Sequence, residues 1–397
     1  MTHAFVGAAM AEYAVPRGAA PRTRLAMMTA GVLAANAPDV DLLYTAIVEE
    51  PLGYLLHQRG HSHTLPGLAA IAQVIWAGVR LLPFMNAAVR GIERRWMILI
   101  AAALGSHLLM DTANGYGTHL FYPWSSGWVY GDAVFVLEPW CWAVLGTMVT
   151  LNAGRRGRIL VGGLTLALLV AVGVIGLLDR LMLAVMLASV SLAALAVRGW
   201  ERPRRAAAGL VAVAVFFAGM IGVSRAAKAS ARTLAGVEDS AVVDVLADAN
   251  PGVPWCWSVL VLERAAADPS KTLVARRSTL SLVPRVWSAA SCASARLWAR
   301  SFGDLSSSSA VVWHRRWEID LDELRRLAGA DCRARAWLQF GRVPYLSDGR
   351  LVDLRFDTPI GQNFTSMPLR GGSECPAYLT NWEPPRGDVL NPPPDRR

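Results

Sequence analysis

The chain has 397 residues, of which 54% are hydrophobic and only 17% are charged, and its mean hydropathy is +0.34. Soluble proteins carry about a quarter charged residues, so this composition argues against an entirely soluble protein. The formal net charge of +9 does not indicate nucleic-acid binding, because many N-terminal arginines occupy short loops between apolar runs. We therefore expect no nucleic-acid partner.

The charged residues are unevenly distributed along the chain. Residues 1–223 contain 16 Lys/Arg and 11 Asp/Glu, whereas residues 224–397 contain 23 and 19. We therefore predict an all-α polytopic membrane helical bundle with a C-terminal extramembrane β-rich (α+β) domain. The expected division is a membrane-embedded helical metal-site region at 1–140, additional transmembrane helices at 141–223, an extracytoplasmic domain at 224–383 and a disordered tail at 384–397.

The N-terminal segments are too short or too polar for a simple spanning helix. The first residues lack a basic n-region, so we do not expect a cleavable signal peptide. Short helices at 3–15 and 24–37 are expected to form a hairpin inside the bundle, because a ~30 Å hydrocarbon core needs about 20 helical residues. Possible spans then follow at 65–82, 96–111, 133–151, 159–178, 181–197 and 206–223.

Arginine-rich loops predict the orientation. The positive-inside rule assigns four loops to the cytoplasmic side, namely 16–24, 83–95, 152–158 and 198–205. The segments 38–64, 112–132 and 179–180, and all residues after 224, then lie outside. We therefore expect a multi-pass membrane protein whose C-terminal domain is extracytoplasmic.

The C-terminal segment mixes patterns typical of strands and helices. Alternation at 258–263, 335–340 and 350–356 predicts strands, and 320–328 resembles a helix. Asn250-Pro251-Gly252 indicates a turn. Four cysteines, Cys256, Cys292, Cys332 and Cys375, allow two disulfides in three connectivities, or remain buried thiols.

Six of the seven histidines precede residue 120, in the half of the chain that is poorest in other polar groups. His107 and Asp111 are spaced i, i+4, which places both side chains on one helix face. Ionisable groups at membrane depth require partners. Together with residues from the predicted outer segments, they form a candidate metal site whose proposed ligands are His3, Asp39, His57, His63, His107 and Asp111.

Imidazole with carboxylate suits a divalent transition metal, with zinc as the first choice and manganese or iron as alternatives. The number of candidates allows one or two ions, and a two-metal centre clamps the attacking and leaving oxygens of a hydrolytic reaction. Asp41 and His61 are assigned catalytic proton transfer. Arg59 either binds a substrate phosphate or extends to the membrane interface.

Other interpretations of these residues remain open. His107 and Asp111 can form a simple hydrogen-bonded pair, Asp39 can cap a helix, and His57 can lie unused at the interface. For His119 we favour an ordinary structural role.

The motifs, in order, resemble the YdjM-like family of predicted inner-membrane-bound metal-dependent hydrolases. The resemblance covers about residues 1–140, and the matching stretches are His3, Pro38-Asp39-Val40-Asp41, Gln58-Arg59-Gly60-His61-Ser62-His63-Thr64, Ser106-His107 through Asp111, and Gly117 through Tyr122-Pro123-Trp124. The resemblance implies a metal site that includes His3, Asp39, His63, His107 and Asp111. Where the family has histidine before Arg-Gly, this chain has Gln58, so His57 or His61 is left to supply that ligand.

The predicted function is therefore a membrane-bound metal-dependent hydrolase at the outer membrane face. Its expected substrate is a phosphoester or ester in a lipid or envelope component, and the lipid bilayer is its expected surrounding. Two alternatives are a metal or proton transporter and a non-catalytic envelope scaffold with a structural metal site.

Overall fold

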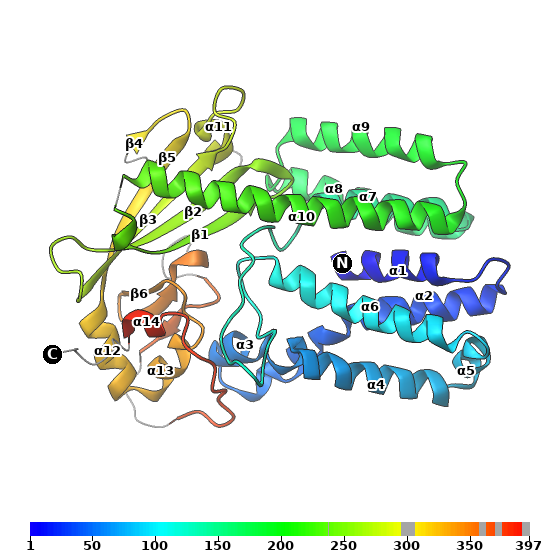
Figure 1. Ribbon diagram of the computed structural model, residues 1–397, viewed down its shortest axis with the longest axis horizontal. Helices are drawn as coiled ribbons and strands as arrows, with labels where there is room; N and C mark the ends of the chain where they lie inside the picture. The colour runs from blue at the N-terminus through cyan, green and yellow to red at the C-terminus, as the bar shows by residue number, and fades with distance from the viewer. Residues whose placement is uncertain (237, 295–305, 357–362, 370–374, 391–397) are drawn as a thin grey trace.

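The structure is a computed structural model that describes residues 1–236, 238–294, 306–356, 363–369 and 375–390. A set of helices lies at one end and an antiparallel sheet region lies at the other (Figure 1). The helices of the N-terminal part are α1 (Thr2–Ala14), α2 (Pro21–Asn36), α3 (Leu52–His57), α4 (Leu65–Leu81), α5 (Pro83–Val89), α6 (Glu93–Thr112), α7 (Pro139–Asn152), α8 (Arg155–Val174), α9 (Arg180–Val197) and α10 (Arg202–Ala235). Short 3₁₀ segments lie between them: η1 (Ala37–Leu43), η2 (Thr45–Ile47) and η3 (His61–His63).

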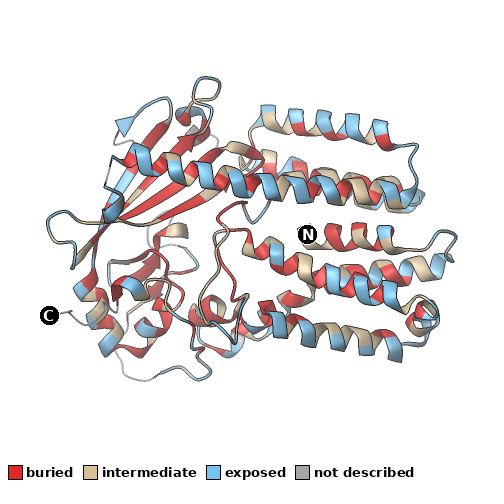
Figure 2. Cartoon of the chain, in the orientation of Figure 1, coloured by how far each residue is buried: buried red, intermediate tan, exposed pale blue. Residues whose placement is uncertain are grey.

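Within the described residues, three helices are long and apolar enough to cross a membrane, namely α8, α9 and α10. A fourth span is possible if the bent pair Leu52–His63 and Leu65–Leu81 counts as one. The outward faces of α4 and α9 are largely exposed (Figure 2), as expected for surfaces that contact lipid rather than protein.

The α1–α2 hairpin predicted from sequence is present, and it packs through small residues. A side chain at Gly7 or Gly31 would collide with the backbone of the other residue. Close approach of helices through small residues is common in membranes. This packing brings the start of α1 next to α6.

Helix α7 differs from the predicted span at 133–151 because it begins only at Pro139. The Glu138 side chain accepts a hydrogen bond from Trp140 N and so caps this start. With 14 residues, α7 is shorter than the ~20 residues that cross a hydrocarbon core.

The C-terminal part contains an antiparallel sheet in the order β1-β2-β3-β5-β4 and a smaller sheet in the order β6-β7-β8. The strands are β1 (Val242–Asn250), β2 (Val253–Arg264), β3 (Thr272–Ser281), β4 (Ser306–Ser307), β5 (Val311–Asp320), β6 (Pro344–Ser347), β7 (Arg350–Asp353) and β8 (Met367–Pro368). The accompanying helical elements are η4 (Asp239–Ala241), α11 (Ala289–Ser294), α12 (Leu321–Ala330), α13 (Cys332–Leu338), η6 (Leu354–Phe356) and α14 (Gly387–Leu390). Helices together with an antiparallel sheet region make the chain an α+β protein.

The C-terminal part contains the predicted turn and helix but lacks one of the predicted strands. The turn at Gly252 is confirmed, with φ of 68°, and the helix-like segment at 320–328 corresponds to α12. The predicted strand at 335–340 is wrong, because its first residues belong to α13. Asp331 caps that helix by accepting from the amides of Arg333 and Ala334, so a local cap outweighs the short alternation.

The tail predicted to be disordered is partly ordered. Val389 and Leu390 of α14 are buried against the sheet region, whereas residues 391–397 lie outside the described part of the chain. Disulfides join Cys256 to Cys292 and Cys332 to Cys375, and Cys141 is a buried free thiol.

Helix α10 connects the two parts. It continues past the predicted boundary at residue 224 to Ala235, where Gly236 ends it with φ of 64°. Its C-terminal half packs against the five-stranded sheet through Met220, Ala227 and Ala231.

Buried ion pairs fasten the sheet region to the loop that follows α6. Arg342 donates to Asp132 at 2.8 and 3.0 Å and to Asp244 at 3.0 Å, and Lys228 donates to Asp132 at 2.6 Å. Although burial raises the pKa of Asp244, the guanidinium groups of Arg342 and Arg386 outweigh that effect and hold it below its ordinary value. The sheet region and the helical region therefore share a charged, buried interface.

Candidate metal centre

Three segments carry the histidine and aspartate residues of the candidate site. The last of them is the C-terminal end of α6, which lies at the end of the helical region that faces the sheet (Figure 1). Asp39 lies in η1, directly after α2 ends, and His63 lies in η3, directly before α4. His107 and Asp111 lie one turn apart near the end of α6. Helix ends and single 3₁₀ turns, rather than helix interiors, therefore present most of the site.

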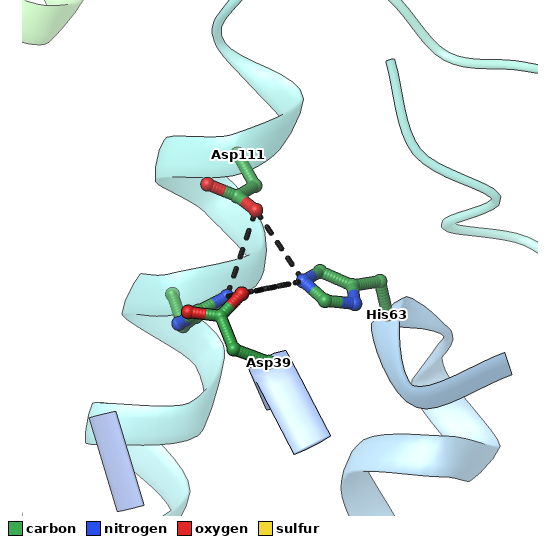
Figure 3. Close-up of side chains that lie close together, drawn as sticks. Asp39, His63 and Asp111 are labelled. Carbon is green, nitrogen blue, oxygen red and sulfur yellow. Dashed lines mark hydrogen bonds and ion pairs between the residues drawn. The ribbon is translucent and has the colours of Figure 1, made fainter. Parts of the chain in front are cut away.

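Four atoms from these segments converge on one point (Figure 3). His63 Nε2 lies 3.1 Å from His107 Nε2, 3.3 Å from Asp111 Oδ2 and 3.8 Å from Asp39 Oδ1. His107 Nε2 lies 3.5 Å from each of the two carboxylate oxygens. All four ligand atoms lie within 4.8 Å of one another, an arrangement that can hold a metal ion.

The far nitrogens of both imidazole rings face oxygen acceptors. His63 Nδ1 lies 3.0 Å from Asp41 Oδ2, and His107 Nδ1 lies 2.7 Å from the carbonyl oxygen of Ala35. Metal-bound histidines usually donate their second ring N–H to such acceptors, which fixes the tautomer and the ring orientation. With the proton on Nδ1 in both rings, each Nε2 presents a lone pair to the common point.

The four converging ligand atoms require a positive charge between them. In this tautomer the two Nε2 lone pairs face each other at 3.1 Å, and two carboxylate oxygens lie beside them. Such donors repel one another unless positive charge lies between them. A divalent cation would satisfy all four at once.

The spacing of the four atoms also fits a transition metal. Ligand bonds of about 2.0–2.1 Å place tetrahedral ligand atoms about 3.3 Å apart. The five separations that involve a histidine nitrogen are 3.1 to 3.8 Å, close to that value, and all four atoms lie within 4.8 Å of one another. The mixture of imidazole and carboxylate leaves zinc, manganese and iron as candidates.

His3 and Arg59 approach the same carboxylate from other sides. His3 Nε2 lies 3.3 Å from Asp111 Oδ1, and its ring stacks on His107 with centroids 3.8 Å apart. Arg59 Nε lies 2.9 Å from Asp111 Oδ2, and its Nη1 donates to Asn114 Oδ1 at 2.7 Å. His3 therefore borders the group of four, and the buried Arg59 guanidinium balances the charge of Asp111.

His57 and His61 are not brought into this group, although the sequence made them candidates as a ligand and a catalytic residue. Residues i and i+2 of a 3₁₀ turn point in different directions, so His61 and His63 separate. His61 is exposed and packs near Trp382 with ring centroids 5.0 Å apart, and His57 packs edge-on against Tyr44. Their chemical roles stay predictions that this geometry does not support.

Asp41 is fully buried, and it holds the turn around His63 together. Its Oδ2 accepts from Arg59 N and Ser62 Oγ at 2.8 Å each, besides facing His63 Nδ1. This geometry suits a positioning role for Asp41 more directly than the predicted proton transfer.

Sequence reasoning missed three partners of the site: Ala35 with its carbonyl, Ser62 and Asn114. Ser62 lies between the two histidines of His-Ser-His, and Asn114 follows Asp111 by three residues, so both carried a local signal. The Ala35 carbonyl carried none, because any residue supplies a backbone oxygen.

His119 lies apart from the group of four and stacks between two aromatic rings. Its centroid is 3.7 Å from that of Trp382 and 4.0 Å from that of Trp128. This burial lowers the pKa of His119 to about 3, so the ring stays neutral at physiological pH. The structural role favoured for His119 fits this position.

Comparison with known proteins identifies the family of the membrane part. No curated protein and no solved structure matches the chain. The model of the family described as YdjM inner membrane protein matches residues 1–229, which is more than half of the chain and includes every residue of the candidate centre. The chain therefore belongs to the YdjM inner membrane protein family.

Proposed function

We propose that this protein is a membrane-bound metal-dependent hydrolase that acts at the outer membrane face on a phosphoester or ester of a lipid or envelope component. The observation that carries the proposal is the convergence of two imidazole lone pairs and two carboxylate oxygens, with both rings oriented by acceptors behind them. A divalent metal bound there supplies Lewis-acid activation of water and of a substrate oxygen.

Uneven burial of the ligands supports a site that is open on one side. The side chains of His63 and His107 are fully buried and that of Asp111 is 7% exposed, whereas that of Asp39 is 38% exposed. Structural metal sites are closed by protein ligands, but catalytic sites keep one position for water or substrate. Exposed Leu43, near Asp39, adds an apolar surface by which a lipid-like substrate can approach.

A cleft that meets the centre through Arg59, and that none of the four ligand residues lines, is proposed to hold the remainder of a substrate. It has a volume of about 450 Å³ and lies between the loop after α6 and the first strands of the sheet. Arg59, Asn114 and Tyr116 line its wall on the side of the metal centre. This volume is within the range of about 300–1,000 Å³ that is typical of ligand clefts. Because Arg59 lines the cleft and also contacts Asp111, we propose that it connects substrate binding to the metal centre.

Two independent features support the proposed orientation. The disulfides of the sheet region are typical of an oxidising compartment outside the cytoplasm. The arginine-rich loops gather at the opposite end of the helices (Figure 1), as expected for the cytoplasmic side. The centre then lies on the outer side, next to the sheet region.

The first test is the metal content of the detergent-purified full-length protein by mass spectrometry. We expect about one or two equivalents of a transition metal in the wild type, and loss of the metal from His63→Ala and from His107→Ala/Asp111→Ala. His61→Ala is the matched control, because it removes an imidazole from the same turn but outside the group of four. A wild type that stays free of metal after reconstitution with zinc, manganese and iron would sink the proposal.

The second test separates catalysis from a structural metal. Metal-loaded protein is assayed with bis-p-nitrophenyl phosphate, a p-nitrophenyl ester and dispersed phospholipid. Hydrolysis that disappears in His63→Ala but persists in His61→Ala supports the enzyme. A stably bound metal without hydrolysis of any probe would favour the scaffold function instead.

A further inference from the structure

A second polar site lies at the end of the helices farthest from the metal centre. The α1–α2 loop and the start of α10 enclose a cavity of about 470 Å³. The charged residues that line the cavity are Glu12, Arg17, Arg24, Glu201, Arg202 and Arg205. The carbonyl groups of Leu151 and Asn152, at the C-terminal end of α7, accept hydrogen bonds from Arg205 and Arg24, so the end of α7 meets the two loops here.

The cavity has a buried floor and an exposed rim. On the floor, Glu12 pairs with Arg24, and the Glu12 side chain is only 2% exposed. On the rim, Arg17 pairs with Glu201 at 2.7 Å, and these side chains are 74% and 56% exposed. A ligand can therefore enter past Arg17 and reach a polar interior.

The charges that line the cavity do not balance. The two carboxylates pair with Arg24 and Arg17, and within the described residues neither Arg202 nor Arg205 forms an ion pair. Arg205 Nη1 donates to a carbonyl at 3.3 Å, but its buried Nε has no hydrogen-bond partner in the described part of the chain. Buried donors without a partner are uncommon in native proteins, and an anion in the cavity would supply one.

The helix ends add to this positive potential. Helices α2 and α10 both begin at the cavity, and neither has a side-chain cap on its first-turn amides. Free first-turn amides and the helix dipole favour anions at such ends. Here they reinforce the arginines rather than replace them.

The surroundings place the cavity at the level of lipid headgroups. Trp200, in the α9–α10 loop, is 48% exposed, and tryptophan is enriched at the membrane–water interface. Leu25 and Leu195, on α2 and α9, are 68% and 59% exposed on the adjoining helix surfaces. A ligand with a charged headgroup and apolar chains would fit both the polar cavity and the exposed apolar surfaces of α2 and α9.

We infer that this cavity binds the phosphate-bearing headgroup of an anionic glycerophospholipid. Arg202 and Arg205 hold the phosphate, the first turns of α2 and α10 face it, and the acyl chains lie along the exposed apolar helix faces. Basic pockets between membrane helices are known to take such headgroups. The site lies at the opposite end of the bundle from the metal centre and requires no metal.

Native mass spectrometry of the full-length protein, released from detergent in the presence of defined lipids, tests this inference. We expect the wild type to hold one dioleoyl-phosphatidylglycerol in at least tenfold preference to dioleoyl-phosphatidylcholine. Arg202→Gln/Arg205→Gln should lose that preference. The matched control is Arg156→Gln/Arg198→Gln, which removes two exposed charges at the same end without touching the cavity.

Two further measurements separate lipid binding from misfolding of the variant and from binding of other anions. The single substitution Arg202→Gln removes a guanidinium that has no carboxylate partner within the described residues, so the variant should fold normally. Its melting temperature checks this. We expect it to bind the lipid more weakly than the wild type. Binding of inorganic phosphate or glycerol 3-phosphate as tight as that of the lipid would overturn the assignment to a phospholipid. Equal losses in the cavity variant and the control variant would also overturn it, because they would indicate general surface attraction.

Discussion

The metal centre and the exposed rim of the cavity at the other end of the helices hold charged side chains in opposite ways. At the metal centre, the carboxylate of Asp111 is almost fully buried and contacts Arg59, His3, His63 and His107. At the arginine-rich end, Arg17 and Glu201 form a pair that is mostly exposed. A buried charge destabilises the fold when any partner is removed, whereas an exposed pair contributes little to the free energy of unfolding. Similar substitutions should therefore change the stability by very different amounts at the two places.

The largest effect is expected for Asp111→Ala. The substitution removes a metal ligand and leaves the buried Arg59 guanidinium without its carboxylate. Breaking a buried pair on one side typically destabilises by about 3–5 kcal/mol. Thermal unfolding in detergent should show a lower melting temperature together with loss of metal. A normal melting temperature would show that Arg59 finds another partner.

A smaller effect is expected for Asp41→Asn, which leaves all four proposed ligands in place. The variant weakens the acceptor that orients His63, and loss of such a partner typically lowers metal affinity about 10–100-fold. Titration against a competing chelator measures this change. Unchanged affinity would mean that Asp41 does not position His63.

The buried, aromatic environment of His119 predicts that the stability of the protein depends on pH. Its folded-state pKa of about 3 lies below the usual value of 6.5, so the unfolded chain binds a proton first as the pH falls. Stability from this group is therefore complete above pH 6.5 and is lost below it, by about 2 kcal/mol at pH 5.

His119→Phe isolates that contribution, because it keeps an aromatic ring beside Trp382 but cannot be protonated. Melting temperatures between pH 7.5 and pH 5 should fall more steeply for the wild type than for the variant. Parallel curves would contradict the prediction, since all other titrating groups are common to both proteins.

The smallest effect is expected for Glu201→Ala at the arginine-rich end. Exposed salt bridges contribute about 0–1 kcal/mol, so the melting temperature should hardly change. A loss as large as that of Asp111→Ala would remove the contrast between the two ends.

Much of the fold was predictable where the signal is local. Helices α8, α9 and α10 lie close to the predicted runs, because a continuous apolar stretch between arginine-rich loops is a property of neighbouring residues. The strand predicted at 335–340 failed because six alternating residues also fit a short helix, and the Asp331 cap decided between the two. The buried pairing of Arg342 with Asp132 joins residues far apart in the chain, and no local pattern indicated it.

In the candidate centre, too, only the local features could be predicted from the sequence. From the sequence alone, His107 and Asp111 are expected on one helix face, because the helical period is a local property. The short motifs that carry histidine and aspartate can also be read from the sequence. The folded chain shows in addition that His63, rather than His57 or His61, meets them, and that Asp41 and the Ala35 carbonyl face the two rings. The physical reason is that these contacts depend on how α2, η3 and α6 pack together, and packing at that distance leaves no periodic trace in the sequence.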